Sequence, residues 1–145
     1  MNSIVLFVVD HKHRDLPSYS LIGYFLTQLG HEVKYVALPK LREVLSKESP
    51  QFIVYPKPNY PKDLFALFVE QGGKLIVIDT EGNNQEMFHK YKISLAPNLF
   101  FVWNQKSLNK YIEFDDGDDH RVVVGGYYRG DFLHSSMRHV HPQRN

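Results

Sequence analysis

The side chains best suited to chemistry lie together in one polar stretch near the start of the chain. The stretch contains two carboxylates, two imidazoles and a guanidinium, from Asp10, His11, His13, Arg14 and Asp15. An imidazole can act as a base near neutral pH, and a guanidinium can hold a carboxylate or phosphate with two hydrogen bonds. The stretch therefore predicts a site that combines anion binding with proton transfer. The structural alternative is a solvated loop in which Asp15 or Ser18 only caps a helix.

A second polar group lies further along the chain, in Asp79, Thr80, Glu81 and Gly82. Its structural alternative is an ordinary loop in which Asp79 or Thr80 caps a helix. If the group faces the first stretch, Glu81 becomes a candidate general base or an acceptor for a sugar hydroxyl.

Both polar groups follow apolar runs that are typical of buried strands. Strand-like segments alternate with helix-like ones, which favours an α/β fold with a single doubly wound, mainly parallel, Rossmann-like sheet and helices on both faces. The expected strands are 3–9, 32–38, 52–55, 74–79, 99–103 and 121–124, and the expected helices are 18–29, 40–47, 61–71, 85–91 and one capped by Asn104.

With right-handed crossovers, we expect the strand order 3-2-1-4-5-6, counting strands along the chain. The first and fourth strands would then be neighbours, with Asp10 and Asp79 at their adjacent carboxyl ends. The loops 10–17 and 79–84 would face one crevice, and ligands of open α/β sheets bind in such crevices.

Composition narrows the class of protein. A chain of 145 residues with 43% hydrophobic residues fits a soluble globular domain. There is no Cys, and the net charge of +1 gives no indication of nucleic-acid binding. Neither a transmembrane segment nor a signal peptide is expected, so a cytoplasmic location is predicted. We expect one domain over residues 1–131, followed by a tail or the start of a second domain over 132–145.

The sequence lacks the signatures of several well-known binding sites. No Gly occurs between Asp10 and Gly23, which argues against a dinucleotide fingerprint after the first strand. Tyr55 and Pro56 stand where a phosphoreceiver domain would carry an Asp. The spacing of His11 and His13 is weak for a metal site, so no metal is expected.

The order of several short motifs resembles bacterial surface carbohydrate (capsule or lipopolysaccharide) biosynthesis proteins. The opening motif is Asp10-His11-Lys12-His13-Arg14-Asp15-Leu16-Pro17, and the others are residues 30–33, 77–82, 101–104 and 123–131. The last of these resembles the family's Gly-Asn-Pro-Arg-Phe-Asp segment, from which Gly126, Tyr127 and Gly130 depart.

This resemblance implies the amino-terminal, acceptor-binding domain of a GT-B-type glycosyltransferase, with a nucleotide-sugar donor held by a second domain and no cofactor bound by this one. The first domain alone is then expected to be inactive. On this reading Asp10, Glu81 and His11 are the candidate catalytic residues, and Asp10 or Glu81 handles the acceptor hydroxyl. Acceptor binding is expected from Arg14, His13, Asp15, Asp79, Thr80 and Gly82, with Arg14 on a phosphate or sugar-acid carboxylate.

Two other functions stay open. The chain could be a non-catalytic interaction module that forms a homo-oligomer or pairs with a separate donor-binding protein, through apolar surface around Tyr127, Tyr128 and Phe132. A small hydrolase using His11 and Asp79 is the weaker alternative, because no nucleophile motif is visible. The expected partner is an acceptor glycan or anionic sugar, with peripheral membrane association left open.

Overall fold

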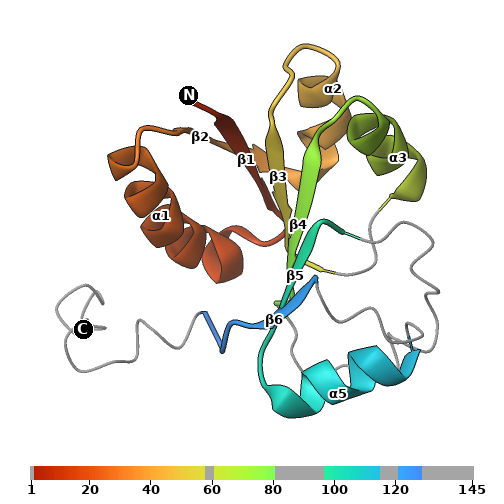
Figure 1. Ribbon diagram of the computed structural model, residues 1–145. Coiled ribbons are helices and arrows are strands. Elements are labelled where there is room, and N and C mark those ends of the chain that lie inside the picture. The colour runs from red at the N-terminus through yellow and green to blue at the C-terminus, as the bar shows by residue number, and fades with distance from the viewer. Residues whose placement is uncertain (1, 58–60, 81–96, 115–120, 129–145) are drawn as a thin grey trace, which may run out of the picture.

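Six strands form a single, entirely parallel sheet in the computed structural model, which describes residues 2–57, 61–80, 97–114 and 121–128. The strands are β1 (Ile4–Val9), β2 (Glu32–Ala37), β3 (Phe52–Tyr55), β4 (Lys74–Ile78), β5 (Leu99–Val102) and β6 (Val122–Val124). Each neighbouring pair is parallel, and the order across the sheet is β2-β1-β3-β4-β5-β6 (Figure 1). The predicted α/β class with one parallel, Rossmann-like sheet is confirmed.

The expected strand order is wrong at one point, because β3 lies between β1 and β4 instead of outside β2. Strand β2 carries Glu32 and Lys34, and its residues are mostly half-buried or exposed. Strands β1 and β3 are instead continuous buried apolar runs. Charges suit a strand at the edge of a sheet, and apolar runs suit its centre. As a consequence, Asp10 and Asp79 do not end adjacent strands.

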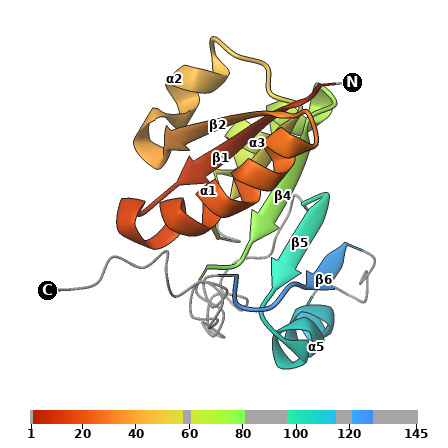
Figure 2. The same cartoon turned by 90° about the vertical axis from the view of Figure 1, so that its left-hand side faces the viewer.

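Helices cover both faces of the sheet (Figure 2). On one face, α1 (Lys12–Gln28) packs Tyr19 and Ile22 against Val5, Phe7 and neighbouring side chains. The other face carries the short 3-10 turn η1 (Leu38–Lys40) and the helices α2 (Leu41–Leu45), α3 (Lys62–Glu70) and α5 (Gln105–Phe114).

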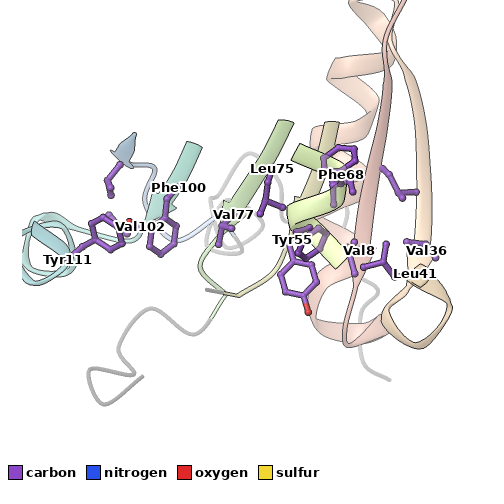
Figure 3. Close-up of a cluster of buried hydrophobic side chains, with 14 residues drawn as sticks. Val8, Val36, Leu41, Tyr55, Phe68, Leu75, Val77, Phe100, Val102 and Tyr111 are labelled. Atoms are coloured by element: carbon purple, nitrogen blue, oxygen red, sulfur yellow. The ribbon is translucent and has the colours of Figure 1, made fainter. Parts of the chain in front are cut away.

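The larger core lies on the face covered by α2, α3 and α5 (Figure 3). Leu41, Phe65 and Tyr111 from these helices pack on strand residues such as Ile53 and Phe100, all of which are almost fully buried. Tyr55 and Phe65 meet edge to face, as do Phe100 and Tyr111. This interdigitated layer fixes the positions of the strand ends from β1 to β5.

Helix α1 begins six residues earlier than expected, at Lys12 instead of Ser18, so the predicted loop 10–17 is mostly helical. Pro17 lies inside this helix and lacks the amide hydrogen that would bond to the His13 carbonyl. Further along, a β carbon at Gly23 would collide with the Tyr35 hydroxyl and Val33. Glycine at this position therefore lets α1 lie close to β2.

The expected helix over 85–91 lies outside the described residues, as does the tail 132–145 with Phe132. Among the helices that are described, none combines the length and the hydropathy needed to span a bilayer.

Candidate functional site

The direction of chain winding changes between β1 and β3. From β1 the chain moves outward to β2, then crosses back to β3 on the other side of β1 and continues through β4, β5 and β6. Open parallel sheets bind ligands at the carboxyl ends of the two strands that flank such a switch point. The residues that follow β1 and β3 are Asp10 and the pair Pro56-Lys57. These residues therefore define the candidate site.

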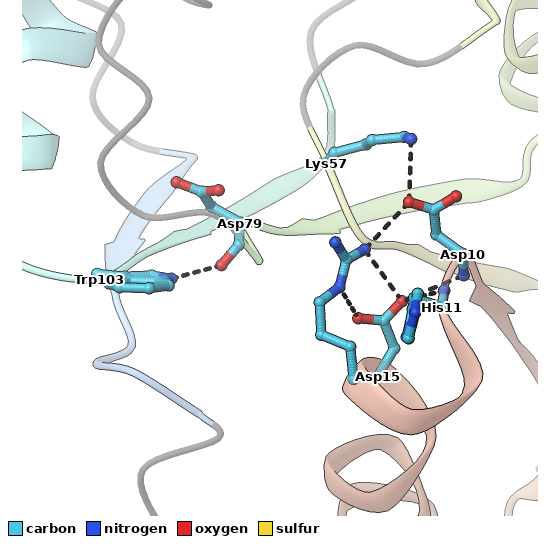
Figure 4. A network of polar contacts seen from close by, with 7 residues as sticks. Asp10, His11, Asp15, Lys57, Asp79 and Trp103 are labelled. Atoms are coloured by element: carbon cyan, nitrogen blue, oxygen red, sulfur yellow. Dashed lines mark hydrogen bonds and ion pairs between the residues drawn. The ribbon is translucent and has the colours of Figure 1, made fainter.

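A salt bridge joins the two sides of the switch point (Figure 4). The Lys57 ammonium donates to Asp10 Oδ2 at 3.1 Å, across 47 residues of sequence. The Arg14 guanidinium donates to the same oxygen at 3.0 Å. One carboxylate oxygen thus accepts from two cations that come from different crossover connections.

Asp15 stabilises the start of α1 next to this salt bridge. Its carboxylate is fully buried and accepts the backbone N–H groups of His11 at 2.9 Å and Asp10 at 3.2 Å. It also accepts the Arg14 Nε–H at 2.7 Å. An acidic side chain that reaches back to orphan N–H groups works as in a capping box, here from the fourth helical position. Asp15 therefore positions Asp10 and Arg14 and has no exposed surface for a ligand.

The pKa of Asp10 reflects two opposing influences. Burial is the largest and raises it, but the hydrogen bonds and charges of Lys57 and Arg14 together outweigh burial and hold the pKa below its ordinary value. Asp10 is therefore ionised at neutral pH and is a weak base. The hydrogen bond to Asp15 is the main cause that raises the pKa of Arg14 above its ordinary value.

Hydrogen-bonding capacity remains on the outer side of the network. The side chains of Asp10 and Lys57 are 26% and 22% exposed. Asp10 Oδ1 has no partner within the described part of the chain, and Lys57 uses one of its three donors, on Asp10. His11 and His13 are exposed nearby, with ring centroids 6.2 Å apart. The site thus offers a fixed acceptor, a fixed donor and two imidazoles.

Tyr55, the last residue of β3, lies under the same edge of the sheet and is only 2% exposed. Burial is the main cause that raises its pKa to about 12, and the negative charge of Asp10 adds to the effect. The phenol therefore stays protonated at neutral pH.

Asp79, from the second polar group, lies apart from the salt bridges of Asp10 (Figure 4). Asp79 and Thr80 are buried, at 5% and 1% exposed. The Asp79 carbonyl accepts the Trp103 indole N–H at 2.6 Å, and the Thr80 N–H donates to the Pro56 carbonyl at 3.1 Å. These contacts tie the end of β4 to β5 and to the connection after β3. Glu81 and Gly82 lie outside the described residues.

Lys57 is the site residue that the sequence interpretation missed. The observed strand order puts β3 next to β1, and this brings Lys57 to Asp10. The available signal was a single lysine held between Pro56 and Pro58 directly after a buried strand. In the ranges that the structure describes, no cluster of His, Cys, Asp or Glu has the geometry of a metal site.

Comparison with protein-family models, with curated proteins and with solved structures finds no match to this chain.

Proposed function

We propose that the chain binds an acceptor glycan at the carboxyl ends of β1 and β3, as the acceptor side of a GT-B-like glycosyltransferase of surface polysaccharide biosynthesis. The observation that carries the proposal is the position of the Asp10–Lys57 salt bridge at the switch point of a parallel sheet. The motif resemblance of the Asp10 stretch supports the same location.

The chemistry of the site favours hydroxyl groups over a bare anion. Asp10, Asp15, Arg14 and Lys57 carry two negative and two positive charges, so their charges cancel. A sugar diol needs an acceptor and a donor side by side, and Asp10 Oδ1 and the Lys57 ammonium supply both. When a sugar covers the site, Asp10 and Lys57 stay paired with each other. Their pairing limits the free-energy cost of removing water from the two charges.

Roles follow from the contacts. Asp10 and Lys57 bind the acceptor hydroxyls, while Arg14 and Asp15 position Asp10. Because Asp10 has a lowered pKa and is a weak base, the exposed imidazoles of His11 and His13 are the candidates to take the proton of the reacting hydroxyl. The nucleotide sugar belongs to the donor domain of such an enzyme.

The proposal is tested by titrating the isotope-labelled protein with methyl β-D-glucoside and methyl β-D-glucuronide while recording amide NMR spectra. We expect shifts confined to the amides of residues 10–14 and Lys57. Lys57→Met is expected to weaken binding roughly tenfold, the effect of one charged hydrogen bond. Lys12→Met, which changes an exposed lysine outside the network, is the matched control. If neither sugar shifts these amides, or if Lys12→Met weakens binding as much as Lys57→Met, the proposal is wrong.

A second candidate is a non-catalytic interaction module, favoured by exposed apolar side chains at the β6 end of the sheet. Val123, Val124 and Tyr127 are each about two-fifths exposed, at 41%, 42% and 41%. Tyr127 also contacts Trp103, with ring centroids 4.4 Å apart. Sedimentation of the wild type and of Val124→Lys distinguishes the two functions. A dimer that the lysine dissociates supports the module, whereas a monomer at all concentrations removes it as a self-association module.

A further inference from the structure

A pocket of about 430 Å³ opens between α2 and α3 and is separate from the Asp10 site. Residues just before β3 and just before β4 line it, so it lies at the amino ends of these strands. The Asp10 network lies at their carboxyl ends. Figure 1 shows α2 and α3 next to each other at that end of the sheet.

Apolar side chains form much of the pocket wall. The main contributors are Leu45 from α2 and Leu64, Leu67 and Phe68 from α3. A β carbon at Gly73 would collide with the Phe68 ring, so glycine allows the ring to lie against the backbone that enters β4. Leu67 is 57% exposed, which leaves apolar surface accessible at the pocket.

Several polar side chains of the wall already have partners within the protein. Gln51 accepts the Ile4 N–H at 2.6 Å and donates to the Ser49 carbonyl at 3.1 Å. Glu48 accepts from the Lys34 ammonium at 2.7 Å, so its charge is neutralised. These groups shape the pocket and have little capacity left for a ligand.

Arg42 is the exception among the charged side chains of the wall. It is exposed, and it makes no ion pair or side-chain hydrogen bond anywhere in the portion of the chain that the structure describes. A guanidinium beside an apolar wall is complementary to a carboxylate attached to a hydrocarbon.

We propose that this pocket binds a small apolar carboxylate, with its hydrocarbon on Leu64, Leu67 and Phe68 and its carboxylate on Arg42. The volume sets the size of the ligand. An apolar cavity of about 150 Å³ holds benzene, and ligand pockets run from about 300 Å³ upward. A pocket of about 430 Å³ therefore has room for a bicyclic aromatic acid. This site is independent of the proposed glycan site.

The test uses 2-naphthoate as the probe and naphthalene-2-carboxamide as its uncharged analogue, each followed by amide NMR titration of the whole chain. We expect shifts at Leu45, Leu67 and Gly72 with both probes, and roughly tenfold tighter binding of the acid. Arg42→Gln is expected to remove the advantage of the acid and leave the amide unaffected. Lys106→Gln, an exposed lysine on α5, is the matched control.

A second variant blocks the apolar wall. Leu67→Glu places a carboxylate at an already exposed position and is expected to abolish binding of the acid, with an unchanged melting temperature showing that the fold is intact. Equal affinity for acid and amide in the wild type overturns the proposal, as does the absence of shifts at the pocket. Sedimentation that shows a dimer dissociated by Leu67→Glu also overturns it, because a second copy would then cover the pocket.

Discussion

The two ends of the parallel sheet differ in whether their charged side chains are paired within the protein. At the carboxyl ends of β1 and β3, four charged side chains satisfy one another, and Asp15 is fully buried among them. At the amino ends of β3 and β4, an apolar pocket has one cation, Arg42, without an ionic partner among the described residues. The charged network at the carboxyl ends contributes to the stability of the fold. At the amino ends, the Arg42 guanidinium is available to a ligand. Substitutions at the two ends should therefore differ in their effect on stability.

The largest effect is expected from Asp15→Ala. This variant leaves two backbone N–H groups and the Arg14 guanidinium without their buried acceptor, which should cost about 3 kcal/mol of unfolding free energy. Urea unfolding at pH 7 measures the loss. Asp63→Ala removes an exposed acidic residue in the first turn of α3 and should cost less than about 1 kcal/mol. Similar losses in the two variants would show that Asp15 does not hold the site together.

Tyr55→Phe tests the buried phenol beneath the same network. The folded-state pKa is raised from 10.0 to about 12, so this contribution to stability is present below pH 10 and is lost as the pH rises towards 12. Over that interval the wild type should lose on the order of 2 kcal/mol more than Tyr55→Phe. Denaturant unfolding at several alkaline pH values measures the difference. Tyr24→Phe on the exposed side of α1 is the control, and parallel curves for wild type and Tyr55→Phe would contradict the expectation.

Asp10→Asn should cost about 1 kcal/mol or less, because the ion pairs of Asp10 are partly exposed. The folded-state pKa of Asp10 lies below 3.8, so its contribution is complete above pH 3.8 and disappears as the pH falls through the lowered value. The stability difference between the wild type and Asp10→Asn should thus be present at pH 6 and shrink towards pH 2. A double-mutant cycle of Asp10→Asn with Lys57→Met isolates the interaction free energy of this ion pair from the other contacts of the two residues. A difference that does not change with pH would count against the salt bridge.

The smallest effect is expected at the other end of the sheet. Arg42→Gln should change the unfolding free energy by less than about 0.5 kcal/mol, because the side chain is exposed and has no partner to lose among the described residues. Thermal unfolding measures this change. A loss comparable to that of Asp15→Ala would show that Arg42 has a structural role, and the contrast between the two ends would fail.

The fold class could be predicted because buried strands have continuous apolar runs and the connecting helices have helical spacing. The sequence also predicts that Asn104 caps a helix. The structure confirms this cap with a hydrogen bond from the Ser107 N–H to Asn104 Oδ1 at 2.9 Å. The strand order is a non-local property, and it could not be read from the spacing of elements. The charges in β2 were the one local indication of an edge strand.

The site was predicted in part. The polar stretch does lie at the carboxyl end of β1, as expected, but its partner is Lys57 and not Asp79. Helix α1 begins earlier than predicted because the buried Asp15 carboxylate accepts the backbone N–H groups of Asp10 and His11 at the helix start. Such contacts depend on burial, and the sequence does not show burial of a charged residue directly. The predicted roles of Arg14 and Asp79 in acceptor binding, and of His11 in catalysis, stay predictions.

The most direct test of the account is the amide NMR titration with methyl β-D-glucoside, carried out in parallel on wild type, Lys57→Met and Lys12→Met. If the switch point binds a sugar through Asp10 and Lys57, the shifts are confined to residues 10–14 and Lys57, and only Lys57→Met weakens them, roughly tenfold. A spectrum that does not change at these amides at saturating sugar, or one that changes equally in all three proteins, would contradict it.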